Sequence, residues 1–439
     1  MRARQDHHAS AGQRSRTSAR WRGGAVVVIA AAALSLTAGT LPASAAGGYP
    51  VTATIKVGTE PAGVAVDTAA GTVYVANAAA GTVSVIDEAT NTVTATIAVG
   101  SDPDAVAVDP VAGTVYVANA GTDPAGTVSV IDAATRAVTA TIAVGARPDA
   151  LAVDPAAGTV YVTNWLDNTV SVIDVAARTV AATIDVGTPP NGVAVDPAAG
   201  TVYVTNSTAN TVSVIDAATS TVTATIDVPV GSIPDTVAVD PAAGTVYVVD
   251  VYANTVSVID VATRAVTGNI AVGSEPEGVA VDPAAGTVYV TNSADNTVSV
   301  IDVATSTMIA TIPIPAPLGY FPLGAFPFRV AVDPATHRAY VTNYEGGTVS
   351  VISAPRAAPV RSLASWRGRQ PMDLAPSRDS RMMSAWPACC AVSAMMCRST
   401  RRADHRSPGA NQGAFGSGCA AFRSGSAVTS ASVRRATSA

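Results

Sequence analysis

The stretch DPAAGTVYVTN at residues 154–164, followed by TVSVID at residues 169–174, is one copy of a sequence repeat. The repeat occurs seven times, with variations, in this chain of 439 residues. Successive copies of its tyrosine are 42, 45, 42, 44, 42 and 51 residues apart. The seven tyrosines are Tyr74, Tyr116, Tyr161, Tyr203, Tyr247, Tyr289 and Tyr340. A period in the low forties with four strand-like runs per copy is typical of a β-propeller with one blade per repeat.

Each repeat contains four short runs in which β-branched residues alternate with smaller ones. In the first repeat they are residues 64–67, 73–77, 82–87 and 93–99, which we call strands A, B, C and D. This alternation and this composition favour strands of a blade that neighbouring blades cover on both sides. The sequence therefore predicts an all-β fold, a seven-bladed β-propeller of four-stranded antiparallel blades.

The repeats also predict how the ring closes. Strands A, B and C occur seven times, but only six D strands follow them, and residues 51–57 form a D-like strand before the first repeat. We expect residues 51–57 to supply the outer strand of the seventh blade, which would protect edges that an open array exposes. A rival strand at residues 359–363 is disfavoured by Pro355 and Pro359.

Two series of aspartates open the A–B and C–D turns, as in the recurring DPAAG segments. An aspartate in such a place accepts hydrogen bonds from the backbone two residues on. We interpret both series as turn residues, not as ligands.

Composition divides the chain into three parts. Residues 1–45 have a basic start, the apolar stretch 25–36 and an Ala-Ser-Ala cleavage pattern, and we interpret them as a secretory signal peptide. An uncleaved membrane anchor is the alternative. Residues 46–355 are the predicted propeller. Residues 356–439 are rich in Arg and Ser and hold all four cysteines. This tail is interpreted as a disordered or out-of-frame extension, with a basic interaction tail and a small disulfide module as alternatives.

The propeller part is acidic. Residues 47–355 hold seven Lys and Arg against 28 Asp and Glu, which argues against nucleic acid as a partner. With a cleaved signal peptide we expect a secreted or cell-surface monomer without a transmembrane helix.

Changes of length fall in the D–A and B–C connections, which share one face of a four-stranded meander. Variation confined to one face is typical of a binding face. The residue after the recurring D–A proline is expected near the channel mouth. In order these residues are Ala62, Asp104, Asp149, Asn191, Asp235, Glu277 and Phe328. A ring of carboxylates suits Ca²⁺, and an acidic rim that only aids solubility is the alternative.

Aromatic residues mark the same face. Trp165, Tyr252 and Tyr344 lie in B–C loops, and Tyr320, Phe321, Phe326 and Phe328 crowd the longest D–A insertion. Exposed aromatics often form a contact surface for a protein or a glycan. The alternative is that the insertion folds over itself and plugs the channel.

The repeat part has few residues for other chemistry. His337 is its one histidine and Met308 its one methionine. Imidazole-rich metal sites, His/Met haem ligation and a serine–histidine–aspartate set on the loop face are therefore not expected. Apart from calcium, no cofactor is expected.

The Tyr-Val-Thr-Asn runs at residues 161–164, 203–206, 289–292 and 340–343 resemble the YVTN-repeat β-propeller family. Residues 74–77 and 116–119 read Tyr-Val-Ala-Asn, and residues 247–250 depart from the pattern as Tyr-Val-Val-Asp. The resemblance implies secreted or surface-layer proteins that act in cell-surface interaction. Related propeller enzymes carry cofactor ligands that have no matching residues here.

Two functions follow as hypotheses. The first is a secreted or cell-surface, non-enzymatic binding or structural module that uses the D–A and B–C loop face, with no catalytic residues. The second is a lactonase-like hydrolase or lyase with a cation at the channel mouth. Near-identical blades favour the first.

Overall fold

The computed structural model describes residues 48–121, 125–315 and 324–355. The predicted signal peptide and the predicted tail lie outside these residues. In the described part no helix is long and apolar enough to cross a membrane.

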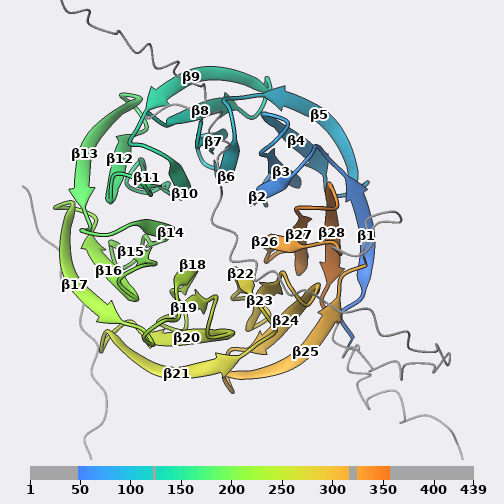
Figure 1. The fold of residues 1–439 in the computed structure, drawn as a ribbon. Coiled ribbons are helices and arrows are strands. Elements are labelled where there is room, and N and C mark those ends of the chain that lie inside the picture. Colours follow the sequence, from blue (N-terminus) through green and yellow to red (C-terminus); the bar gives the residue numbers. More distant parts are fainter. Residues whose placement is uncertain (1–47, 122–124, 316–323, 356–439) are drawn as a thin grey trace, which may run out of the picture. The chain divides into compact units, whose positions relative to one another are not determined.

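Seven four-stranded antiparallel sheets surround a central axis (Figure 1), so the predicted seven-bladed propeller is confirmed. The innermost strands are β2 (Pro61–Asp67), β6 (Pro103–Asp109), β10 (Pro148–Asp154), β14 (Pro190–Asp196), β18 (Pro234–Asp240), β22 (Pro276–Asp282) and β26 (Pro327–Asp333). The second strands are β3 (Thr72–Asn77), β7 (Thr114–Asn119), β11 (Thr159–Asn164), β15 (Thr201–Asn206), β19 (Thr245–Asp250), β23 (Thr287–Asn292) and β27 (Arg338–Asn343).

The third strands are β4 (Thr82–Asp87), β8 (Thr127–Asp132), β12 (Thr169–Asp174), β16 (Thr211–Asp216), β20 (Thr255–Asp260), β24 (Thr297–Asp302) and β28 (Thr348–Ser353). The outermost strands are β5 (Thr92–Ala98), β9 (Ala137–Ala143), β13 (Thr179–Asp185), β17 (Thr221–Asp227), β21 (Ala265–Ala271), β25 (Thr307–Pro313) and β1 (Val51–Lys56). We number the blades 1 to 7 from β2 to β26.

Blade 7 joins the two ends of the propeller. Its sheet has the order β1–β28–β27–β26, and Ile55 of β1 pairs with Val349 of β28. The expected closure by the N-terminal strand is therefore confirmed.

The core lies between the blades. Tyr161 of β11 packs with Val170 of its own blade and with Val193 and Val202 of the next blade, and equivalent clusters recur around the ring. Burying each valine contributes about 1.5–3 kcal/mol relative to exposure. Each blade packs against a neighbour on either side and contributes to a cluster on each. This explains why both faces of its strands carry apolar residues.

The asparagine that ends most second strands ties strand B to strand C. Asn206 donates from Nδ2 to Thr211 Oγ1 at 3.0 Å and to Ser213 Oγ at 2.9 Å. Five further blades carry the same pair of bonds. In blade 5 the position is Asp250, which accepts hydrogen bonds from the hydroxyls of Thr255 and Ser257.

The aspartates of the two turn series cap turns, as expected. Asp154 Oδ1 accepts hydrogen bonds from the backbone N–H groups of Ala156 and Ala157 at 3.0 and 3.1 Å. Asp132 Oδ1 accepts from the backbone and side chain of Thr135. These carboxylates hold the backbone of their own turns.

Candidate functional site: a carboxylate and guanidinium cluster at the channel mouth

The D–A and B–C connections meet on one face, which we call the loop face; the A–B and C–D turns form the turn face. On the loop face the residue after strand B donates a backbone hydrogen bond to the preceding D–A loop. Trp165 donates to the carbonyl of Arg147 at 3.0 Å, and Tyr344 donates to that of Phe326 at 2.9 Å. The D–A and B–C loops differ in sequence from blade to blade, but the same backbone hydrogen bond joins them.

The residues after the D–A prolines occupy an irregular point in each innermost strand. In β10, Pro148 pairs with Asn164, but the next paired residue is Leu151, so the ladder register shifts around Asp149. Every innermost strand has such a shift just after its proline. Bulges re-aim side chains and are frequent beside functional sites.

The threonine of the Tyr-Val-Thr-Asn motif fixes the neighbouring blade at this point. Thr163 Oγ1 donates to the carbonyl of Asn191 at 2.7 Å, and Thr205 Oγ1 donates to that of Asp235 at 2.5 Å. The same hydroxyls accept hydrogen bonds from the bulged N–H groups of their own blades. The recurring threonine therefore orients the backbone of the next candidate site residue.

A cavity of about 140 Å³ lies where these bulges converge. Asp104, Asp149 and Arg329 line it, together with small residues such as Gly192 and Gly278. The fourth residue of each innermost strand is aliphatic and also lines the cavity. These residues are Val64, Val106, Leu151, Val193, Val237, Val279 and Val330. The cavity thus combines charged groups with an apolar lining.

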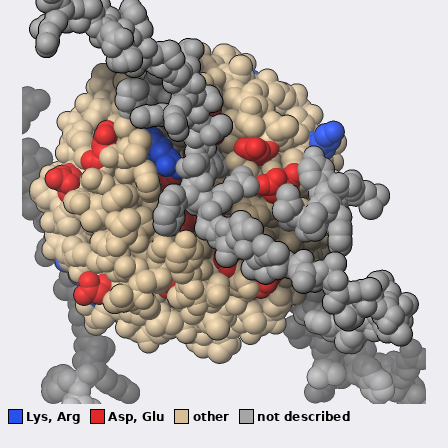
Figure 2. Space-filling view, in the orientation of Figure 1, with Lys and Arg blue, Asp and Glu red and all other residues tan. Residues whose placement is uncertain are grey.

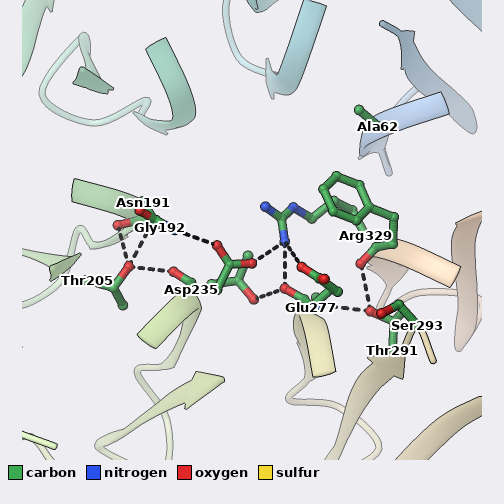
Figure 3. A network of polar contacts seen from close by, with 12 residues as sticks. Ala62, Asn191, Gly192, Thr205, Asp235, Glu277, Thr291, Ser293 and Arg329 are labelled. Carbon is green, nitrogen blue, oxygen red and sulfur yellow. Dashed lines mark hydrogen bonds and ion pairs between the residues drawn. The ribbon is translucent and has the colours of Figure 1, made fainter. Parts of the chain in front are cut away.

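Arg329 of β26 reaches across to two other blades (Figure 3). Its Nη1 donates to Asp235 Oδ2 at 2.6 Å and to the carbonyl of Glu277 at 2.6 Å. The Glu277 carboxylate is 4.0 Å away, and Asn191 Nδ2 donates to Asp235 Oδ1 at 3.0 Å. Three of the predicted residues are therefore joined in one network by an arginine.

Sequence reasoning missed Arg329, although a signal was present. The third position of the innermost strands is small in six blades and arginine in the seventh. The residues are Gly63, Ala105, Ala150, Gly192, Thr236, Gly278 and Arg329. A single long, charged side chain in this series is the departure that marks the site.

The local electrostatics favour protonated carboxyl groups. Burial, with repulsion from Asp104 and Asp235, raises the pKa of Asp149 to about 7, although Arg329 and Arg147 oppose this. Burial and the Asp235 charge raise the pKa of Glu277 to about 8. Burial disfavours the charged Arg329, but the surrounding carboxylates more than offset it, and its pKa is raised. Two carboxyl groups therefore titrate near neutral pH, where a general acid or base is most effective.

Three of the predicted aromatics, Tyr344, Phe326 and Phe328, pack together. Tyr344 is only 3% exposed, and its ring centroid is 5.5 Å from that of Phe328, beside Ala62 and Ala78. Its hydroxyl donates to Glu60 Oε2 at 2.5 Å. The expectation of an exposed aromatic is wrong for Tyr344, because the small alanines of blade 1 leave room for its ring.

Two further predicted aromatics, Trp165 and Tyr252, lie in the loops of blades 3 and 5. The guanidinium of Arg147 stacks 4.5 Å from the Trp165 ring, and Tyr252 is 52% exposed. Tyr320 and Phe321 lie outside the described residues. Figure 2 shows that uncharged residues make up most of the face drawn there, with acidic side chains in separate places.

Across the described ranges, no three His, Cys, Asp or Glu side chains form a group that could hold a metal ion. His337 lies in the β26–β27 turn on the turn face, with Nδ1 2.9 Å from Asp282 Oδ2.

Fold and site define a seven-bladed β-propeller with a charged cavity at one end of its channel. The family described as lactonase, seven-bladed β-propeller, matches residues 45–270, more than half of the chain, and the chain belongs to this family. Among solved structures, "Kuenenia stuttgartiensis Hydrazine Synthase" is similar over 67% of this chain and 96% of that chain, with 22% identity and a TM-score of 0.60. That likeness concerns the fold alone. No curated protein matches the sequence.

Proposed function

We propose that this propeller is a secreted or cell-surface binding module whose ligand enters the channel mouth from the loop face. The cavity lined by Asp104, Asp149 and Arg329 carries the proposal. The signal-like N-terminus and the likeness to YVTN-repeat proteins favour a cell-surface role, with a glycan or a protein as the partner.

The rigidity of the site supports a binding role. Its residues stand on innermost strands, and Thr163 and Thr205 fix the backbone of Asn191 and Asp235 from the neighbouring blade. Site residues held on strands keep a fixed geometry better than residues on loops. Trp165 and Tyr252 extend the surface outward and suit contact with a larger partner.

A glycan array probed with the full chain tests this function. Binding to a defined set of glycans that falls about tenfold or more in Asp149→Asn, but not in Asp132→Asn, would support the channel mouth. Asp132 caps a turn on the turn face and serves as the matched control. Equal binding by both variants would place the contact elsewhere and contradict the proposal.

Lactone hydrolysis is a second candidate, favoured by the family and by the presence of Asp149 and Arg329 in the lining of one cavity. Asp149 would take a proton from a water whose oxygen attacks the lactone carbonyl carbon, and Arg329 would stabilise the resulting oxyanion. Collapse breaks the bond to the ring oxygen, which receives the proton from Asp149 and gives a hydroxy acid. Such a base and such an oxyanion donor each contribute about 10²-fold or more to the rate.

A panel of γ- and δ-lactones followed by pH titration tests this second function. We expect kcat/KM to fall at least about 100-fold in Asp149→Asn and in Arg329→Met. Turnover that survives both substitutions would exclude this cavity as the catalytic site.

A further inference from the structure

The exposed apolar side chains of the loop face come from three consecutive blades. Among the described residues, the large apolar side chains exposed in its loops are Leu166 of blade 3, Val230 in the connection from blade 4 to blade 5, and Tyr252 of blade 5. Their exposed fractions are 57, 97 and 52%. Blade 4 lies between blades 3 and 5 (Figure 1) and adds the exposed Thr208 and Ala209, which carry no charge. We call these five residues the apolar arc.

A departure from the repeat creates the most exposed side chain of the arc. The connection from β17 to β18 contains the dipeptide Pro229-Val230, which the equivalent connection from β21 to β22 lacks. The N–H of Tyr252 donates to the carbonyl of Ser232 in the same connection at 3.0 Å, so the loops that carry Val230 and Tyr252 are tied together. A folded monomer gains nothing from so exposed a valine, whereas a partner that covers it removes apolar surface from water.

Acidic side chains border the arc on the side of blade 6. The N–H of Glu275 donates at 2.9 Å to Asn254 Oδ1, in the loop that also carries Tyr252. Asp295 is exposed in the next B–C loop, and its Oδ2 accepts a hydrogen bond from the N–H of Ser274 at 2.7 Å. A neutral N–H donor does not cancel the charge of a carboxylate. A partner that covers Tyr252 therefore meets negative charge beside it.

The charge of the whole domain selects the class of partner. Residues 47–355 hold 28 Asp and Glu against seven Lys and Arg. Such a surface repels nucleic acids and anionic lipids, whereas it attracts protein segments rich in Lys and Arg. Tyrosine is also enriched where proteins bind one another. A basic protein segment with apolar side chains is the occupant that fits both the arc and its acidic border.

We infer that the apolar arc docks a protein segment whose apolar side chains cover Val230, Tyr252 and Leu166. Its Lys or Arg side chains would face Glu275 and Asp295. The inference names a protein as the partner of the proposed binding module, and it rests on that proposal in placing the contact on the loop face. None of these five residues lines the channel cavity, so the contact does not require a ligand inside it.

Panning a phage library of random dodecapeptides on the full chain tests the inference. Enriched peptides should combine apolar residues with Lys or Arg, and fluorescence anisotropy of synthetic copies measures their affinity. Substituting Val230→Ser together with Tyr252→Ser should weaken binding about tenfold or more. Val111→Ser is the matched control and should leave the affinity unchanged, because Val111 is 83% exposed in the β6–β7 turn on the turn face. Glu275→Gln should slow association and leave dissociation unchanged.

Four outcomes would overturn the inference. The first is a library from which no peptide is enriched. The second is enrichment of peptides without Lys or Arg, and the third is equal weakening by Val111→Ser. The fourth is binding of phosphatidylcholine vesicles that the double substitution abolishes, with no peptide enriched, which would show a surface for membranes.

The same experiment separates this inference from the proposed function. Glycan recognition that depends on Asp149, with no enriched peptide, would refute the docked protein while the channel-mouth site stands. Peptide binding that depends on Val230, with glycan recognition indifferent to Asp149, would support the apolar arc and refute the channel mouth as the binding site.

Discussion

Blades 1 to 6 are each made from one continuous stretch of chain, whereas blade 7 joins β1 to β26, β27 and β28. Blade 7 also supplies contacts that depart from the repeat. Arg329 enters the channel mouth, Tyr344 donates to Glu60 of blade 1, and Arg338 donates to the carbonyl of Glu88 at 2.7 Å. The repeat therefore determines the scaffold, and departures from the repeat mark the closure and the candidate site.

The largest expected effect comes from breaking the closure. Deletion of residues 48–56 should abolish cooperative unfolding, because β28 loses its partner and the Ile55 cluster between blades 7 and 1 opens. Thermal melts followed by circular dichroism measure this. The control Thr54→Ala changes an exposed residue of the same strand and should alter stability by less than about 0.5 kcal/mol. An unchanged melt of the deletion variant would refute closure by β1.

A smaller effect is expected at the blade that departs from the repeated asparagine. Asp250 is fully buried, and burial raises its pKa despite hydrogen bonds from Ser257 and Thr255. A carboxyl whose pKa is raised on folding favours the folded state most at low pH, and that contribution is lost as pH rises toward the folded pKa. Asp250→Asn should therefore stabilise the protein more at pH 8 than at pH 4.5, by about 1–2 kcal/mol at pH 8.

Urea unfolding at the two pH values measures this difference. The reverse change in an ordinary blade, Asn206→Asp, is the matched control and should destabilise more at pH 8 than at pH 4.5. A loss of stability in Asp250→Asn at both pH values would contradict the prediction. It would show that the hydrogen bonds to the Asp250 carboxylate outweigh the cost of burying its charge.

The smallest effect tests a single contact of the closing blade. Tyr344→Phe removes the hydroxyl that donates to Glu60 and should cost about 1 kcal/mol in the free energy of unfolding. Tyr252→Phe, at an exposed loop position, should stay within about 0.5 kcal/mol of the parent. Equal losses of unfolding free energy in the two variants would show that the hydrogen bond from Tyr344 to Glu60 adds no stability of its own.

The sequence was sufficient for the fold because period, strand alternation and turn aspartates all agree, and the missing D strand predicted the closure. The site was predicted only in part. Asn191, Asp235 and Glu277 do converge, but the sequence predicted either a cation site or an acidic rim that aids solubility, and neither included an arginine. Arg329 meets them across two blade boundaries, and a pattern read within each repeat does not show which side chain crosses to another blade.

Closure by β1 also fixes the order in which the molecule can be completed. The strand that leaves the ribosome first pairs with the strand of the propeller that leaves last, so the ring cannot finish while synthesis of the domain continues. Pairing of such distant segments is slow compared with local hairpins, because the intervening chain must first be brought together. Until β1 pairs with it, the outer edge of β28 is exposed. The sequence of β28 resembles those of the six other third strands. Rapid production of this protein should therefore favour exchange of β1 between chains, and linked dimers are the expected by-product of its folding.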